Sequence, residues 1–164
     1  MTNIDYVGPA NNWYRLSMDH LPNRTPDRVK DRPTWLISRA FARSSGLLAA
    51  GFESHGAGLR SYHYRLLAAL EEWGPQSQAD LGRGTGIDRS DITAAMSELE
   101  SRLLVERSPD PEHGRRNIVT ITPAGVDRLR ELDTVIDGVQ EAVLAPLSAT
   151  QRGKFLELVR LVGG

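Results

Sequence analysis

The sequence predicts a mainly α-helical fold with one small β-hairpin between helices, and two patterns carry this prediction. Apolar residues recur at helical spacing through most of residues 33–162. Only residues 105–108 and 117–122 alternate apolar and polar side chains and are rich in β-branched residues, which is typical of strands. A chain of 164 residues is long enough for one domain with a core, or for a small domain with helical appendages.

The first 32 residues differ in composition from the rest. They hold several prolines, paired asparagines and the charged run DRVKDR, so we expect mostly coil, with a short helix around residues 13–20 as an alternative. The N-terminus lacks the basic and apolar regions of an export signal, and no window approaches about 18 apolar residues. We therefore expect a cytoplasmic protein without a membrane partner.

Two helices are predicted next. The first begins at Pro33, which suits a first helical turn, and stops at Gly56. The second covers residues 61–72, carries three leucines on one side, and ends at the Trp-Gly-Pro sequence because Gly and Pro cannot continue a helix.

Residues 77–86 and 88–104 are two further helical candidates, joined by a Gly-rich link. Asp88 is placed to cap the second of them. Its apolar stripe consists of Ile92, Ala95, Met96, Leu99 and Leu103. Its opposite side carries the small residues Ser90, Ala94, Ser97 and Ser101, with Thr93 alongside.

The two alternating segments predict a hairpin closed by residues 109–116. A long helix then starts with Thr122 as N-cap and Pro123 in the first position, and extends to about Leu147. A last helix starts at Ser148 and ends near the C-terminal Gly-Gly.

Two helices joined by a short Gly-containing turn form a helix-turn-helix candidate, and the hairpin directly after it makes the unit winged. A helix that enters a DNA major groove, about 12 Å wide, needs small side chains and donors on its outer side. We predict DNA contacts from Arg89, Ser90, Thr93, Ala94 and Ser97. Hydroxyl side chains also solvate ordinary helix surfaces, so this helix alone leaves both interpretations open.

The hairpin tip favours the DNA interpretation. Arg115 and Arg116 suit the narrow, negative minor groove, and Asp110 could hold Arg115 in a forked ion pair. Without the neighbouring helix, a solvated turn would be the better explanation of these arginines. Residues 59–126 hold 8 Arg and 10 acidic side chains, and the net charge is −1, so any DNA contact must be local, with the acids on another side.

The segment IDRSDITAAMSELESRLLVERSPDPEHGRRNIVTITPAG resembles the winged helix-turn-helix of the MarR (multiple antibiotic resistance regulator) family of transcriptional regulators. The matching motifs are the helix exit L-x-x-x-G-L-V-x-R, here with Leu104 where glycine is usual, the wing DPEHGRR, and the strand-to-helix sequence ITPAG. The resemblance implies a homodimer on a pseudo-palindromic operator, with Asp110 orienting the wing and Arg115 in the minor groove. Position 94 is often Arg in the family, and Glu98 stands where a basic residue is common, so Glu98 is not assigned to DNA.

Three regions follow from this interpretation: an N-terminal extension (1–32), a helical dimerisation region (33–58 and 124–164), and a winged helix-turn-helix DNA-binding lobe (59–123). The long helices carry more apolar surface than the lobe can cover, which favours a dimer over an intramolecular helical subdomain. The interface candidates are Leu144, Leu147, Phe155, Leu158, Val159 and Leu161.

Proteins of the resembled family often release DNA when a small aromatic or phenolic molecule binds near the dimerisation helices. Aromatic side chains with polar ends suit such a ligand. The candidates here are Trp35, Phe41, His55, Tyr62 and His63; membership of the hydrophobic core is the alternative for each.

Other functions lack sequence support. The chain has no cysteine, which excludes disulfides, thiolate zinc sites and thiol redox sensing. Its four histidines show no metal-ligand spacing, although a zinc-sensing variant with His55 and His63 stays open. No nucleophile–base pair or paired catalytic carboxylates stand out, so we expect neither an enzyme nor a cofactor.

The sequence thus predicts a dimeric, ligand-responsive repressor that binds double-stranded DNA. Two alternatives remain: a winged-helix module that binds another protein, which near-neutral charge and Glu98 favour, and a small-molecule-binding protein without a DNA function.

Overall fold

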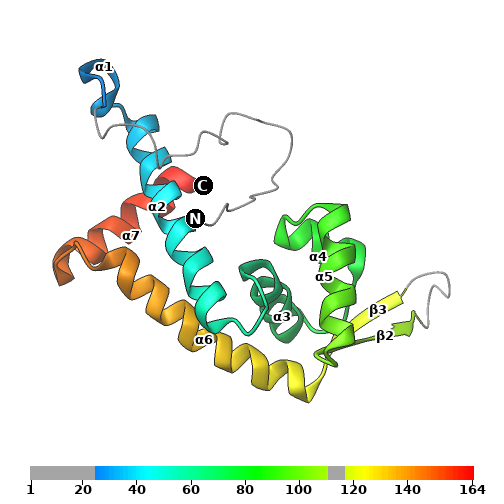
Figure 1. Ribbon diagram of the computed structural model, residues 1–164. Helices are drawn as coiled ribbons and strands as arrows, with labels where there is room; N and C mark the ends of the chain where they lie inside the picture. The colour runs from blue at the N-terminus through cyan, green and yellow to red at the C-terminus, as the bar shows by residue number, and fades with distance from the viewer. Residues whose placement is uncertain (1–24, 111–116) are drawn as a thin grey trace. The chain divides into compact units, whose positions relative to one another are not determined.

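A computed structural model describes residues 25–110 and 117–164, and it confirms the mainly α-helical fold with a small antiparallel sheet (Figure 1). The chain divides into two compact units, Met1–Arg39 and Ala40–Gly164. The elements in order are α1 (Asp27–Lys30), α2 (Pro33–His55), α3 (Ser61–Trp73), β1 (Gln76–Ser77), α4 (Gln78–Thr85), α5 (Arg89–Ser101), β2 (Val105–Pro109), β3 (Asn117–Ile121), α6 (Pro123–Leu144) and α7 (Ala149–Gly163). None of the helices in residues 25–110 and 117–164 combines the length and the apolar character that a membrane span needs.

The first unit contains one helix that the sequence did not predict. The four-residue α1 lies in the segment expected to be coil, and an ion pair between Asp27 and Lys30 (3.0 Å) spans it. The helix considered around residues 13–20 lies outside the described residues. In α2 of this unit, Trp35 is half-buried, whereas Leu36 and Ile37 are exposed.

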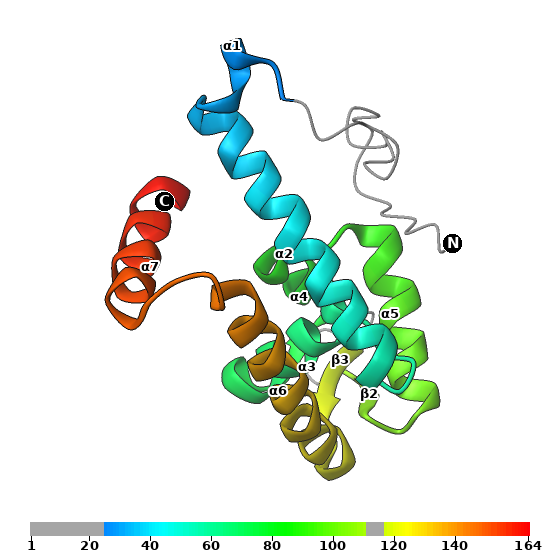
Figure 2. The same ribbon diagram turned by 60° about the vertical axis from the view of Figure 1, so that its left-hand side comes forward.

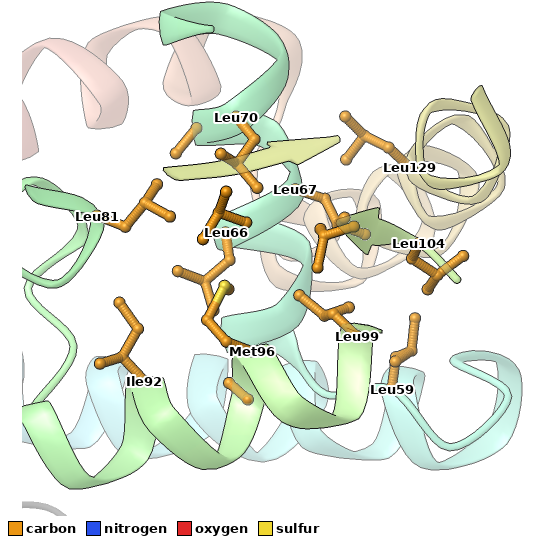
Figure 3. Close-up of a cluster of buried hydrophobic side chains, with 14 of the residues drawn as sticks. Leu59, Leu66, Leu67, Leu70, Leu81, Ile92, Met96, Leu99, Leu104 and Leu129 are labelled. Atoms are coloured by element: carbon orange, nitrogen blue, oxygen red, sulfur yellow. The ribbon is translucent and has the colours of Figure 1, made fainter. Parts of the chain in front are cut away.

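The second unit is built around a leucine-rich core between α3 and α5. The three leucines of α3 and the stripe of α5 from Ile92 to Leu99 are almost fully buried, as predicted. Figure 3 shows these side chains gathered together, with Leu81 of α4 beside them. Burial of each such side chain contributes roughly 2 kcal/mol, so this core fixes α3, α4 and α5 as one lobe.

The turn between α4 and α5 is short because two glycines allow close approach. Gly86 ends α4 with φ +67°, a left-handed conformation that favours glycine. At Gly82, a Cβ atom would lie 3.3 Å from the carbonyl oxygen of Ile87 and 3.5 Å from the Ile92 side chain. Asp88 stands at the N-cap position of α5 as predicted, but its side chain makes no capping hydrogen bond. The predicted role of that carboxylate as a cap is therefore wrong.

The predicted hairpin exists, and it belongs to a three-stranded sheet in the order β1-β3-β2. Strands β2 and β3 pair antiparallel, with Val105 opposite Ile121 and Ser108 opposite Ile118. The third strand, β1, pairs through Gln76 and Ser77 only. Two residues are too few to show an alternating pattern, which is why the sequence did not reveal it.

The end of α5 differs from the prediction. The helix stops at Ser101, and Leu103 adopts φ +60° with 75% of its surface exposed, so Leu103 does not continue the apolar stripe. Leu104, in contrast, is buried. Glycine is favoured at positions with a left-handed backbone conformation, such as that of Leu103. The glycine of the family motif therefore corresponds to Leu103, and the prediction that it corresponds to Leu104 is wrong.

The two C-terminal helices begin at the predicted caps. The Thr122 hydroxyl accepts a hydrogen bond from the Gly125 N–H (3.0 Å), and Ser148 forms a capping box with Gln151. Helix α6 ends at Leu144, three residues earlier than expected. Figures 1 and 2 show α7 following the end of α6 and lying apart from α4 and α5. Of the interface candidates, Leu144 and Leu147 are half-buried, and the four on α7 are exposed.

Candidate nucleic-acid interface

The predicted DNA-contacting residues of α5 share one exposed surface. Arg89, Ser90, Thr93, Ala94 and Ser97, here called the α5 outer face, are all exposed, while the opposite side of the helix is buried. Ala94 and the short hydroxyl side chains leave the backbone of this face accessible. The surface therefore has the small, donor-bearing character that a major groove accepts.

The hydroxyl of Thr93 is held by two contacts within the lobe. It accepts a hydrogen bond from Gln78 Nε2 at the start of α4 (2.8 Å) and donates to the carbonyl oxygen of Arg89 (3.0 Å). Gln78 thereby joins the first helix of the helix-turn-helix to the second at the α5 outer face. Periodicity could not reveal this residue, because the contact joins side chains 15 positions apart on two different helices.

A second residue absent from the prediction, Arg107, joins α5 to the wing strand β2. Its Nη2 donates to the Ser97 hydroxyl (3.4 Å), and its Nε lies 3.6 Å from the Glu100 carboxylate. Ser97 in turn donates to the carbonyl oxygen of Thr93 (3.0 Å). Ser97 thus lies on the outer face but also takes part in the contact between α5 and β2.

The wing tip is only partly described. Asp110 directly follows β2 and is half-buried. Arg115 and Arg116 lie outside the described residues. The forked pair between Asp110 and Arg115, and the minor-groove role of the arginines, therefore stay predictions.

Three acidic side chains of the lobe have basic neighbours. Asp80 pairs with Arg83 within α4, and Glu100 lies beside Arg107. Glu98 accepts a hydrogen bond from Arg102 (2.8 Å) and lies 3.3 Å from His63 Nε2. The contacts of Glu98 are thus made inside the lobe, which weakens the reason for regarding it as a protein-docking residue.

His63, a ligand candidate, has no exposed surface. Its Nδ1 accepts a hydrogen bond from the Arg60 N–H (3.0 Å) at the start of α3, and its ring lies 4.2 Å from that of Tyr62. Burial lowers the pKa of His63 to about 4, although the nearby Glu98 carboxylate acts in the opposite direction. The imidazole is therefore neutral at pH 7, with its remaining N–H on Nε2, which lies near Glu98 but forms no hydrogen bond with it.

The neighbouring tyrosines are also held within the lobe. Burial raises the pKa of the Tyr62 phenol. Tyr64 donates its hydroxyl to the Asp133 carboxylate of α6 (2.9 Å), and burial together with this hydrogen bond raises its pKa to about 12. Both phenols therefore stay protonated at neutral pH.

A groove of about 740 Å³ lies between α2 and α6 in the second unit. Of the four ligand candidates in that unit, only His55 lines it, since Phe41, Tyr62 and His63 are elsewhere. One part of the groove is polar and the other apolar. The polar lining is Ser54, His55, Arg128, Glu131 and Thr134, and the larger apolar side chains are Leu47, Val135 and Val139. This combination suits a small amphipathic molecule.

Comparison with known proteins places the chain among transcriptional regulators. The family model described as "MarR family" matches residues 57–116. The HTH-type transcriptional repressor NicR of Pseudomonas putida is 30% identical over 138 residues, which cover 84% of this chain and 86% of that protein.

Two solved structures have the same fold. A probable transcriptional regulator from Pseudomonas aeruginosa is 32% identical with a TM-score of 0.70, covering 80% of this chain and 97% of that one. The PcaV transcriptional regulator of Streptomyces coelicolor, in complex with its natural ligand, is 27% identical with a TM-score of 0.68, covering 85% and 97%. The exposed α5 outer face beside an antiparallel wing agrees with these relatives, and we conclude that this chain belongs to the MarR family of winged helix-turn-helix transcriptional regulators.

Proposed function

We propose that this protein is a dimeric repressor that binds a pseudo-palindromic DNA operator and leaves it when a small aromatic acid or phenol binds. The observation that carries the DNA half of the proposal is the α5 outer face, where five small or basic side chains are exposed together. Its nearest acids, Asp88 and Asp91, are exposed at the start of the helix, so binding must be local and specific rather than a bulk charge effect.

Two hydrogen bonds support a preformed DNA-binding surface. The hydrogen bond from Gln78 to Thr93 fixes α4 against α5, and Arg107 fixes the wing strand against the same helix. A surface that needs little ordering loses little conformational entropy on binding. In this proposal Arg89 contacts guanine or phosphate, and Arg115 at the wing tip enters the minor groove.

Selection of bound sequences from a random double-stranded DNA pool tests the proposal. We expect enrichment of an inverted repeat, with nanomolar to micromolar binding that weakens as salt rises. Arg89→Ala and Arg115→Ala should each weaken binding about tenfold or more, with an unchanged melting temperature. A wild-type protein that selects no sequence would rule the proposal out.

The ligand half of the proposal is supported by the groove between α2 and α6. Its volume, about 740 Å³, is in the range of small-molecule sites. Arg128 on its wall already pairs with Glu131 and donates to the Gly56 carbonyl, so a ligand carboxylate would have to share or displace the Glu131 contact. His55, in the same lining, is close enough to bind a hydroxyl group of the ligand. The NicR relative is called a repressor, and PcaV was solved with its natural ligand, which also favours an effector-released regulator.

Calorimetric titration with flat aromatic acids, such as benzoate derivatives, tests the ligand site. Binding should be lost in Arg128→Gln and retained in Arg130→Gln, a change on the same helix at a residue paired with Asp127 outside the groove. An acid that binds equally to both variants would place the site elsewhere.

A protein-interaction module is the competing function, and the same selection experiment separates the two. If no DNA is enriched, the α5 outer face would be the surface to examine for a protein partner, because its residues are exposed on a well-packed lobe.

A further inference from the structure

The corner between α2 and α3, residues 56–60, is held from two sides through successive carbonyl groups. Arg128 Nη2 of α6 donates to the carbonyl oxygen of Gly56 (2.9 Å). Arg102 Nη1, at the end of α5, donates to the carbonyl oxygen of Ala57, the next residue (2.9 Å). Two helices that are distant in sequence thus bind adjacent peptide groups of one turn.

The backbone of this corner has little freedom. Ala57 has φ +47° and Gly58 has φ +84°, and the left-handed conformation is uncommon for alanine. A Cβ atom at Gly56 would lie 2.5 Å from the carbonyl oxygen of Phe52 and 2.6 Å from that of Leu59. Strained conformations of this kind persist only where the surroundings hold them, and here the two guanidinium groups do so.

Arg102 is also bound on its other side. Its Nη2 donates to Glu98 Oε1 (2.8 Å), while the second carboxylate oxygen of Glu98 lies 3.3 Å from His63 Nε2. Because the Nδ1 atom of His63 accepts from the backbone of Arg60, its Nε2 must carry the proton and face Glu98. The Glu98 carboxylate therefore lies between two N–H groups: Arg102 is hydrogen-bonded to one oxygen, and His63 Nε2 is close to the other without hydrogen-bond geometry.

We propose that Arg102 and Glu98 are positioning residues for DNA binding: they tie the C-terminal end of α5 to the α2–α3 corner, whose adjacent carbonyl Arg128 holds from α6. The inference rests on the proposed DNA function of α5. It explains why an acidic residue is present on a helix that approaches DNA. Glu98 sets the orientation of α5 through Arg102 and His63, and that contribution outweighs the repulsion between its charge and the phosphates.

Glu98→Gln gives the sharpest test, because the two explanations predict opposite changes in operator affinity. A positioning role predicts weaker binding, whereas loss of charge repulsion alone predicts tighter binding. An amide has one acceptor oxygen and one NH₂ group, so in either orientation it directs a donor at Arg102 or at His63. We expect binding to the selected operator to weaken about fivefold. Glu106→Gln removes the same charge from an exposed position on β2 and should leave binding unchanged or slightly tighter. Operator binding by Glu98→Gln that equals or exceeds that of the wild type would overturn the inference.

Arg102→Lys separates positioning from direct phosphate contact. The charge is retained, but an ammonium lacks the fork that spans Ala57 and Glu98. We expect weaker operator binding with unchanged affinity for random DNA and an unchanged dependence on salt. A lysine variant that binds the operator like the wild type would show that only the charge matters.

The link to α6 is tested by combining Arg102→Lys with Arg128→Lys. Because the two side chains hold neighbouring carbonyls of one turn, their effects on operator affinity should deviate from the product of the single effects by about threefold or more. Arg130→Lys, an exposed arginine of α6 paired with Asp127, serves as the control and should show no such deviation. If the effects of Arg102→Lys and Arg128→Lys on operator affinity multiply, as those of Arg102→Lys and Arg130→Lys should, the link is overturned.

Hydrogen exchange of the DNA-free protein gives a second readout. In Arg102→Lys, amide exchange should rise together in residues 56–60 and in the last turn of α5, and unchanged exchange in both places would also overturn the tie. If the wild type selects no DNA, both the proposed function and this inference fail. If the wild type binds and the variants match it, only the inference fails.

Discussion

At the scale of single residues, His63 shows how a polar side chain can belong to a core. Its Nδ1 accepts a hydrogen bond from the backbone N–H of Arg60, and its Nε2 lies 3.3 Å from Glu98 without hydrogen-bond geometry, so the neutral ring makes one hydrogen bond inside the lobe. Its folded pKa of about 4 lies below the ordinary 6.5. Between these values the unfolded chain binds more protons than the folded one, so the stabilising contribution is complete above pH 6.5 and is lost as the pH falls toward 4.

The free energy of unfolding should therefore fall between pH 7 and pH 4, with roughly 2 to 3 kcal/mol of the loss due to His63. In His63→Asn, which keeps a short side-chain acceptor for the cap, this part of the slope should disappear. Urea unfolding across the pH range measures it, with exposed His55→Asn as the control. Equal slopes in wild type and His63→Asn would show that His63 does not titrate in this way.

Leu103 supplies a second prediction at the residue scale. A leucine with φ +60° and 75% exposure is strained and loses little by truncation. Leu103→Gly should raise the free energy of unfolding by about 0.5 to 1 kcal/mol. The same change at buried Leu104 should lower it by about 3 kcal/mol. Chemical denaturation of both variants measures these changes, and a Leu103→Gly protein less stable than the wild type would contradict the strain at this position.

At the scale of elements, the junction of the sheet and α6 depends on Gly125. A Cβ atom there would lie 2.1 Å from the carbonyl oxygen of Leu104 and 2.7 Å from Ile121. The same carbonyl accepts from the Thr122 N–H (3.1 Å), so the start of α6 lies directly on the strand entry. This close approach accounts for the glycine in the ITPAG sequence.

Gly125→Ala should thus destabilise the protein by about 2 kcal/mol or more, because backbone rather than a flexible side chain blocks the methyl group. Gly138→Ala on the same helix meets no atom within 4 Å and should be stabilising by about 0.5 to 1 kcal/mol. Thermal melting of the two variants measures the difference. A Gly125→Ala protein as stable as the wild type would mean that α6 can move away from Leu104 at little cost.

At the scale of the whole molecule, α7 carries apolar side chains that are partly or largely exposed. Phe155, Leu158, Val159 and Leu161 are 37 to 75% exposed, and no residue of α7 is buried. An apolar surface of this kind is typical of a protein interface. We propose that a second copy of the chain covers it.

Sedimentation should therefore show a particle of twice 18.1 kDa for the wild type. Leu158→Glu should raise the dissociation constant of the dimer by about tenfold or more, since a charge would be buried in the interface, and should weaken operator binding because two half-sites are no longer held together. Thr150→Glu, at an exposed position in the first turn of α7, is the control. A monomeric wild type, or a Leu158→Glu dimer as tight as the wild type, would contradict the proposal.

Most elements could be predicted because their signals are local. The capping residues Thr122 and Ser148, the stripe from Ile92 to Leu99 and the alternation in the two wing strands each act within a few positions. The errors fall where contacts between distant segments decide the outcome. Leu103 has an acceptable helical spacing, but the chain must turn there to bring Leu104 and Val105 into the core and sheet.

The candidate DNA surface was predictable on α5, because exposure follows from the helical period once the buried stripe is known. Gln78, Arg102 and Arg107 were not, since each acts through a partner on another element. The ligand candidates share aromatic rings, several with polar ends, and the sequence does not show which of them line one groove. His63 was among them because a sequence cannot distinguish a buried histidine that caps a helix from one that lines a groove.

The sequence by itself determined the order of the six longer helices and the two wing strands, the two-sided character of α5 and the family, because periodicity, capping and motif spacing are properties of neighbouring residues. The tertiary structure alone decided that Glu98 faces Arg102 and His63, that a third strand completes the sheet, and that Arg102 and Arg128 hold adjacent carbonyls of one corner. These contacts join residues up to 72 positions apart, and hydrogen-bond geometry at that separation depends on how the core packs.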